Sequence, residues 1–196
     1  MHYYSEKPDC KLEQKKINII LRGNKLELLL SSGVFSKSNV DKGTQLLIQS
    51  AIIQPKWKIL DFGCGNGIVG IAIAKAYPDC GVLLSDVNER ALETAQKNIL
   101  LNNLKNAKAV KSDMFENIKS KFDAILLNPP QTAGKEICFQ MIEESKQHLN
   151  KSGLLQFVAR EKKGGKALNN KMNDIFKNCL VIGESSGYNV YAGKNV

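Results

Sequence analysis

The pattern best suited to hold a ligand is a set of three glycines at alternate positions. It directly follows an apolar run that ends in an acid. Residues 57–62 are largely apolar and contain Asp61, and Gly63, Gly65 and Gly67 follow before a second apolar segment at helical spacing. This order predicts a buried strand, a tight loop and a helix N-terminus. Glycine permits positive φ and a close approach of backbone to ligand, and open α/β sheets bind ligands at the carboxyl ends of strands. We therefore expect a small-molecule site here.

The chemistry of this loop has more than one interpretation. Residues 65–70 satisfy G-x-G-x-x-G, the dinucleotide fingerprint, so a nicotinamide-binding oxidoreductase is one candidate. A carboxylate at Asp61, two residues before the first glycine, suits a cationic amino-acid group better than a pyrophosphate. A glycine-rich turn without any ligand is the third interpretation.

Two more predicted strands end in acids. Residues 81–85 lead into Asp86, and residues 107–115 are predicted as a strand that contains Asp113. A carboxylate at the end of the second strand can accept hydrogen bonds from ribose hydroxyls. Asn88 is placed to cap the next helix. Helix capping by Asp86 and an ordinary turn at Asp113 are the structural alternatives.

A rigid amide-bearing turn follows the apolar residues 122–127. Asn128 precedes Pro129 and Pro130, which fix φ twice and remove two N–H donors. The Asn128 side-chain oxygen and the Pro129 carbonyl could both accept from one exocyclic amine of a planar substrate. A strand that simply stops at two prolines is the alternative.

The charge of the chain favours a polyanionic partner. The 196 residues carry a formal net charge of +9 and a pI of about 9.3, which favours RNA or DNA through attraction to phosphates. Lys135 and the basic loop 160–166, with Arg160, Lys162 and Lys163, are the best candidates for phosphate contacts. A lysine-rich solvated surface is the alternative.

The cysteines indicate neither a disulfide framework nor a zinc site. All five are scattered, without a C-x-x-C pair, and Cys64 inside the glycine loop is interpreted as a small loop residue. The sequence shows no signal-peptide core and no apolar run long enough to cross a bilayer. We expect an intracellular, cytoplasmic protein without a metal ion or a membrane contact.

The remaining pattern predicts two regions, an N-terminal extension over residues 1–43 and a main domain over residues 44–196. The extension contains two β-prone runs around Gly23, which predict a hairpin that caps one edge of the main domain, with a helix at 26–30 as the alternative. Thr44 is predicted to cap a helix over 45–53, and ordinary helix capping is one interpretation of the loop before it. Further elements are predicted as helices over 136–149 and 166–177 and strands over 153–159, 179–182 and 188–192.

Several of these segments resemble one enzyme family. Residues 61–67 resemble motif I of class I S-adenosylmethionine-dependent methyltransferases, and residues 112–114 resemble their adenine-binding segment. Residues 128–130 resemble motif IV of enzymes that methylate adenine N6, guanine N2 or glutamine. The resemblance implies an α/β fold with a Rossmann-like seven-stranded sheet and helices on both faces. It also implies that the loop before the 45–53 helix lies over the cofactor, with Phe35, Asp41 and Gly43 as candidate lid residues. It implies that Asn128, Pro129 and Pro130 orient the amine, and that the cofactor is bound by Asp61, Gly63, Gly65, Asn66, Asp86, Asn88, Asp113, Met114 and Asn128.

One residue that differs from the family motif reduces the number of expected substrates. Position 131 is Gln, where adenine-N6 and glutamine enzymes usually carry an aromatic residue that stacks on the target. Residues 2–8, 32–44 and 131–136 instead resemble the small-domain guanine-N2 ribosomal RNA methyltransferases and their stand-alone archaeal-like relatives, so the resemblance covers nearly the whole chain. It implies methylation of guanine N2 in ribosomal RNA, and we expect a monomer, although no feature of the sequence decides the oligomeric state. Methylation of adenine N6 or glutamine and a non-catalytic RNA-binding module remain alternatives.

Overall fold

A seven-stranded, mostly parallel sheet forms the centre of the computed structural model, which describes residues 14–31, 40–130 and 134–196. The strand order is β5-β4-β3-β6-β7-β9-β8; the first five strands are parallel, and β9 pairs antiparallel with both β7 and β8. This arrangement confirms the predicted seven-stranded α/β fold. The strands are β3 (Lys58–Phe62), β4 (Gly81–Asp86), β5 (Ala107–Lys111), β6 (Phe122–Leu127), β7 (Leu149–Arg160), β8 (Leu180–Ser185) and β9 (Tyr188–Lys194).

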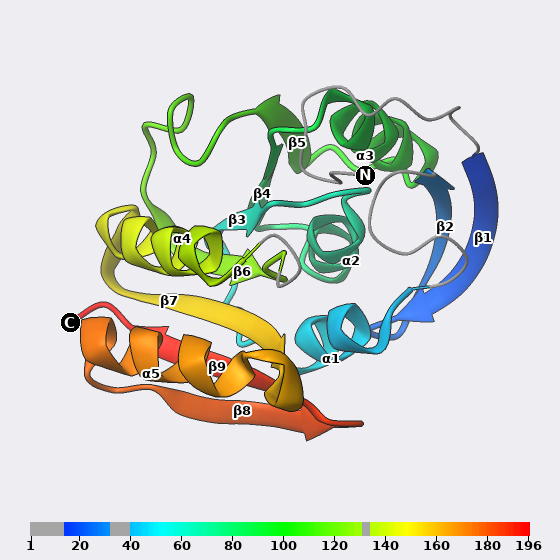
Figure 1. Ribbon diagram of the computed structural model, residues 1–196. Coiled ribbons are helices and arrows are strands. Elements are labelled where there is room, and N and C mark those ends of the chain that lie inside the picture. The colour runs from blue at the N-terminus through cyan, green and yellow to red at the C-terminus, as the bar shows by residue number, and fades with distance from the viewer. Residues whose placement is uncertain (1–13, 32–39, 131–133) are drawn as a thin grey trace.

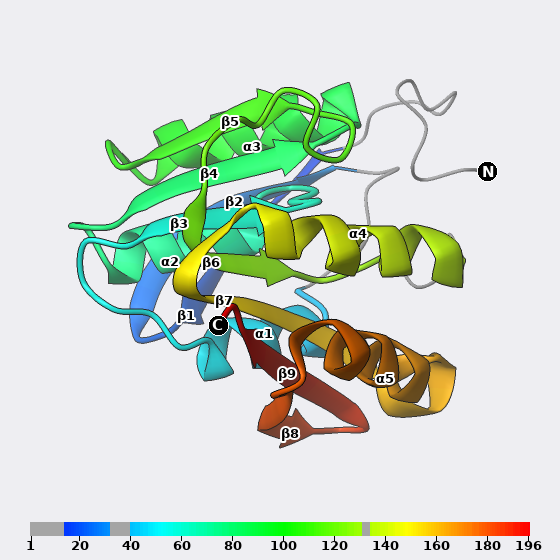
Figure 2. The same ribbon diagram turned by 90° about the vertical axis from the view of Figure 1, so that its left-hand side faces the viewer.

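Helices cover both faces of this sheet (Figures 1 and 2). One face packs against α1 (Lys42–Ser50), α2 (Ile68–Ala76) and α3 (Glu89–Leu101), and the other against α4 (Lys135–Gln147) and α5 (Gly165–Phe176). Successive strand residues point to opposite faces, so Ile59 and Leu60 are both fully buried yet belong to different cores. The central strands read as continuous apolar runs because both of their faces are buried.

The predicted hairpin is present, and the structure shows which elements it covers. Strands β1 (Gln14–Leu21) and β2 (Asn24–Ser31) pair antiparallel around a turn at Arg22 and Gly23, both with positive φ. Leu26, Leu28 and Leu30 are buried, so this segment is a strand rather than a helix. The hairpin lies outside α2 and α3 as an additional layer, not along an edge of the main sheet (Figure 1). The division of the chain at residue 43 stays a prediction.

Asn98 of α3 and Asn102, the C-cap of that helix, form hydrogen bonds to the β2 backbone as a neighbouring strand would. The Asn98 side chain accepts from Leu29 N at 2.7 Å and donates to Leu29 O at 2.9 Å, and Asn102 makes the same pair of bonds to Glu27 at 3.2 and 2.7 Å. Residues four apart lie on one face of a helix, and residues two apart on one side of a strand, so the two spacings match. The exposed edge of β2 is thereby satisfied by side chains.

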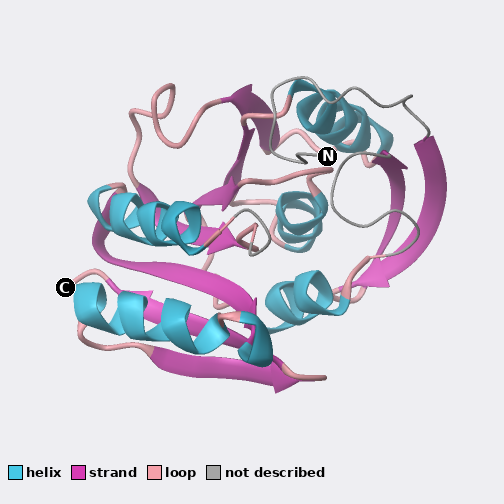
Figure 3. Cartoon of the chain, in the orientation of Figure 1, coloured by secondary structure: helices cyan, strands magenta, loops and turns pink. Residues whose placement is uncertain are grey.

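Three elements differ from their predictions, and Figure 3 shows the elements as observed. Local hydrogen bonds explain the first two differences. Helix α1 begins at Lys42 because Asp41, not Thr44, is its N-cap and accepts from Thr44 N at 3.0 Å. Strand β5 ends at Lys111, since the Ser112 hydroxyl donates to Met114 O at 2.9 Å and so forms a turn. The segment 160–166, predicted as a basic loop, contains a 3-10 helix, η2 (Glu161–Lys163), directly before α5.

Candidate functional site

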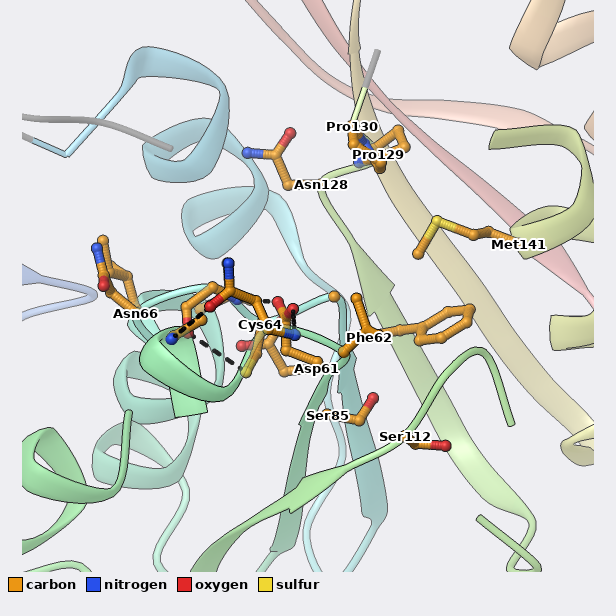
Figure 4. A pocket seen from close by; sticks show the side chains of 18 of the residues that line it. Asp61, Phe62, Cys64, Asn66, Ser85, Ser112, Asn128, Pro129, Pro130 and Met141 are labelled. Atoms are coloured by element: carbon orange, nitrogen blue, oxygen red, sulfur yellow. Dashed lines mark hydrogen bonds between the residues drawn. The ribbon is translucent and has the colours of Figure 1, made fainter. Parts of the chain in front are cut away.

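The two main motifs meet because of the register of their strands. Strand β3 lies beside β6, with Asp61 level with Leu126 and Phe62 level with Leu127. The glycine loop and the Asn128 turn therefore leave adjacent parallel strands at the same height. Both line one cavity of about 350 Å³ at the carboxyl edge of the sheet, with Asn128 and Pro129 across the cavity from Asp61 and Cys64 (Figure 4).

The glycine loop has a conformation that requires glycine. Gly63, Gly65 and Gly67 have φ of 66°, 54° and 80°. A Cβ on Gly67 would stand 2.8 Å from the Leu84 side chain, and Gly67 is the N-cap of α2. The loop is held from outside as well, since Gly65 N donates to Asp86 Oδ2 at 2.8 Å. The first two of these glycines line the cavity.

Asp61 is a buried carboxylate at the cavity wall. Its side chain is only 2% exposed, and Oδ2 accepts from Gly70 N at 2.8 Å in the first turn of α2. Burial raises the pKa of Asp61 from 3.8 to about 7; the Gly70 hydrogen bond lowers this pKa, and the charge of Asp86 raises it. A cationic ligand group would favour the ionised form of this carboxyl.

Asp86 and Asn88 have distinct roles at the end of β4. Asp86 accepts from Gly65 N and, through Oδ1, from Asn88 N at 2.9 Å, and burial raises its pKa. Asn88 is the predicted cap of α3, with Oδ1 accepting from Ala91 N at 3.1 Å. Asp86 therefore does not cap that helix, and both residues line the cavity.

The predicted adenine segment also reaches the cavity. Asp113 and Met114 follow the end of β5 and line the cavity together with Ser112. Asp113 is exposed, whereas Met114 is partly buried and has φ of 42°. The acids after three successive strands thus surround one space.

Asn66 is held in place by the hairpin layer. Its Oδ1 accepts from the Ser31 hydroxyl at 2.8 Å, and its backbone carbonyl accepts from Asn98 at 2.9 Å. Asn66 Nδ2 and the hydroxyl of Ser85 are buried and have no hydrogen-bond partner within the described ranges. Both residues line the cavity, so a polar ligand suits its wall.

The Asn128 turn is anchored to the first helix. Asn128 Nδ2 donates to Thr44 Oγ1 at 2.9 Å, and the two prolines complete this side of the cavity. Of the candidate lid residues, Asp41 lines the cavity and Gly43 does not. Phe35 lies outside the described residues, as does Gln131.

Helix α4 supplies two cavity residues that the sequence did not single out for binding. Met141 and Ile137 line the space, and a Cβ on Gly63 would lie 3.3 Å from Met141 Cε. Figure 4 shows Met141 directed toward the same cavity as Asn128. The only signal in the sequence was the apolar side of an amphipathic helix, which equally indicates core packing.

None of the four predicted phosphate-binding residues lines the cavity. Lys135 begins α4, and Arg160, Lys162 and Lys163 lie at the carboxyl end of β7; all four are exposed. Because β7 is parallel to β6, this basic segment leaves the sheet at the edge that bears the cavity. The Arg160 guanidinium also lies over the Tyr188 ring, 5.8 Å from its centroid.

The cavity has the opposite charge to the protein as a whole. Its described lining contains four aspartates and no lysine, arginine or histidine; the acids are Asp41, Asp61, Asp86 and Asp113. Such a lining favours a cation and disfavours the pyrophosphate of a dinucleotide. Burial also raises the pKa of Cys64 well above its usual range, so this thiol is a poor nucleophile.

The part of the chain that the structure describes contains neither a metal-binding cluster nor a membrane-spanning helix. Across residues 14–31, 40–130 and 134–196, no cluster of three or more His, Cys, Asp or Glu side chains could hold a metal ion. In the same ranges no helix has the length and apolar character needed to span a bilayer.

Comparisons with known proteins identify the family. Residues 25–192 match the protein family described as methyltransferase small domain. The uncharacterised protein YbxB of Bacillus subtilis is 38% identical over all of this chain and 98% of its own length. A ribosomal RNA small subunit methyltransferase C of Haemophilus influenzae is 35% identical over 83% of this chain, but the match spans only 49% of that relative.

The fold has a close counterpart among solved structures. A 16S rRNA N2 methyltransferase (RsmC) of T. thermophilus, solved with AdoMet and guanosine, superposes with a TM-score of 0.83 at 21% identity, over 97% of this chain and 52% of that one. The chain thus spans about half the length of the named methyltransferases that it matches. With its sheet order and the family match over most of its residues, it belongs to the methyltransferase small-domain family.

Proposed function

We propose that this protein transfers a methyl group from S-adenosylmethionine to the N2 amine of a guanine in ribosomal RNA. The observation that carries the proposal is the single cavity in which an acid-lined glycine loop faces Asn128 and Pro129. The charge of the lining argues against the nicotinamide cofactor that the G-x-G-x-x-G pattern allowed.

The described residues fit S-adenosylmethionine in charge and shape. Asp61 would face the cationic methionine end, and the glycine loop leaves room for it. Asp86 would accept from the ribose hydroxyls, and Asp113 with Met114 would hold the adenine. Asn66 and Asn88 would complete the binding wall. When bound, the cofactor supplies an activated methyl group on a sulfonium, so the protein's contribution is chiefly positioning.

The substrate amine would be held by the stiff loop. Asn128 Oδ1 and the Pro129 carbonyl are the acceptors for its two hydrogens, and Pro130 keeps the turn rigid. This arrangement directs the lone pair of the nitrogen toward the donor side of the cavity.

Ribosomal RNA is supported by charge and by the relatives. The net charge of +9 contrasts with the acidic cavity, and Lys135, Arg160, Lys162 and Lys163 lie at the same sheet edge as the cavity. The Haemophilus relative is named for methylation of small-subunit ribosomal RNA, and the T. thermophilus counterpart for N2 methylation with guanosine bound. A cytoplasmic monomer acting on RNA is part of the same proposal.

The test is a methyl-transfer reaction in which the modified nucleoside is identified. The protein is incubated with methyl-labelled cofactor and total RNA or ribosomal subunits from cells that lack the gene, and nucleosides are identified by mass spectrometry. We expect label in N2-methylguanosine. Label in N6-methyladenosine or in protein glutamine would refute the guanine assignment.

A variant separates catalysis from cofactor binding. Asn128→Ala should lower turnover by roughly 10²-fold or more, while its dissociation constant for S-adenosylhomocysteine stays within about twofold. Thermal shifts with NADH and S-adenosylhomocysteine are compared in parallel. Stabilisation by NADH alone, or full turnover of the variant, contradicts the proposal.

A further inference from the structure

A short chain of hydrogen bonds leads from the first helix to the Asn128 amide. Thr44 Oγ1 donates to Asp41 Oδ2 at 2.5 Å, and Asn128 Nδ2 donates to Thr44 Oγ1 at 2.9 Å. All three residues line the cavity, and Thr44 is 84 positions from Asn128 along the chain.

The Asp41 carboxylate fixes which group donates in each of these two hydrogen bonds. An ionised carboxylate only accepts hydrogen bonds, so the single hydroxyl hydrogen of Thr44 is committed to Asp41. The Thr44 oxygen can then only accept from Asn128, which must present its NH₂ group. The carbonyl oxygen of the same amide is therefore directed away from Thr44.

From this geometry we propose that Asp41 and Thr44 are positioning residues that fix the orientation of the Asn128 amide and so make the site specific for an amine. The inference rests on the proposed function, in which Asn128 Oδ1 accepts from the target –NH₂. If the amide were reversed, its NH₂ would meet the NH₂ of the substrate, and two donors would face each other. A reversed amide would instead match a carbonyl, such as the keto group of a base.

The local structure keeps Asp41 in place for this role. Asp41 Oδ1 accepts from Thr44 N at 3.0 Å as the cap of α1, which leaves Oδ2 for the hydroxyl. A Cβ on Gly43 would stand 3.1 Å from Asp41 Oδ1 and 3.0 Å from the Tyr188 ring, so only glycine leaves this space open.

The opposite end of α1 is fixed to the sheet. The fully buried Gln156 side chain of β7 accepts from Ile52 N at 2.7 Å and donates to Ile52 O at 2.8 Å. Thr44 therefore stands on a helix anchored at both ends, which suits it to orient a side chain of another strand.

Asp41→Asn is the decisive substitution because Asn and Asp cap helices about equally well. The new side chain still accepts from Thr44 N, but its NH₂ now donates to the Thr44 hydroxyl. The Thr44 hydroxyl hydrogen is then released from residue 41 and can be donated to Asn128, whose carbonyl turns toward Thr44 when it accepts this hydrogen. We expect kcat for RNA to fall by roughly 10²-fold, the loss typical of removing one aligned polar contact. The dissociation constant for S-adenosylhomocysteine should stay within about twofold.

Matched controls separate orientation from charge and folding. Asp79→Asn makes the same charge change at an exposed turn before β4, at the opposite edge of the sheet, and should leave kcat within about twofold. Thr44→Val should lower kcat as Asp41→Asn does, and Thr44→Ser, which keeps the hydroxyl, should rescue most of the loss. Equal kcat for Thr44→Val and Thr44→Ser, or native kcat for Asp41→Asn, would overturn the inference.

An NMR measurement on the substrate-free protein tests the orientation of Asn128 independently of the proposed function. In ¹⁵N-asparagine-labelled protein, the Asn128 amide signal is assigned as the one missing in Asn128→Asp. Its NH₂ protons should show an NOE to the Thr44 methyl group, and Asp41→Asn should abolish it. Native protein that shows the NOE but methylates no RNA refutes the proposed function and leaves the orientation standing. Native protein without the NOE refutes the orientation, whatever its activity.

Discussion

Asp61 makes a prediction that links stability to ligand binding. Its pKa rises from 3.8 to about 7 on folding, which corresponds to about 4 kcal/mol at 1.36 kcal/mol per pKa unit. Between these values the folded state binds more protons at Asp61 than the unfolded state does. The contribution of Asp61 to stability is therefore most favourable below pH 3.8 and is lost as the pH rises toward 7. An ionised Asp61 thus destabilises the ligand-free protein at neutral pH.

Asp61→Asn removes this titration while keeping an oxygen that can accept from Gly70 N. The amide NH₂ adds a cost of about 1–3 kcal/mol if it finds no partner, but that cost does not depend on pH. The difference in unfolding free energy between variant and native protein should therefore move by about 3 kcal/mol in favour of the variant between pH 5 and pH 8.

Urea denaturation of both proteins at pH 5, 6, 7 and 8 without ligand measures this difference. Binding of S-adenosylhomocysteine to the native protein should weaken by about tenfold from pH 7 to pH 5.5, because the ligand's ammonium requires the ionised carboxylate. Binding to Asp61→Asn should be weaker and nearly independent of pH over the same range. A stability difference that stays constant with pH would refute the reasoning.

Three further predictions concern packing and RNA. Asn98→Leu leaves two β2 backbone groups and a glycine-loop carbonyl without partners, so unfolding free energy should fall by about 2–5 kcal/mol in urea titrations; a loss below about 1 would contradict this. Gly70→Ala places a Cβ 2.7 Å from Leu84 Cγ and should cost about 1–3 kcal/mol and weaken S-adenosylhomocysteine binding by calorimetry, so native values for both would argue against it. Replacing Lys162 and Lys163 with Ser should reduce the slope of log affinity against log salt by about 0.7–0.9 per lysine in RNA titrations, whereas an unchanged slope would remove them from the interface.

The sequence was most informative where structure depends on neighbours in the chain. The strand, glycine loop and helix around Asp61 follow from an apolar run, residues that permit positive φ, and helical spacing. The cap at Asn88 and the rigid turn after Asn128 are also local, because one residue type fixes the backbone next to it. These segments also sufficed to predict the sheet and the family.

The tertiary structure decided how distant side chains pair. Asn128 meets Thr44 across 84 positions, and Gln156 meets Ile52 across 104. Met141 lines the cavity although its sequence pattern equally fitted a core position. The hairpin lies over helices because Asn98 of α3 and its C-cap Asn102 form hydrogen bonds to the edge of β2. Such contacts produce no periodic or local pattern in the sequence, because they form only when the topology brings separate elements together. The sequence therefore determined the two loops, and folding determined which atoms of those loops face each other.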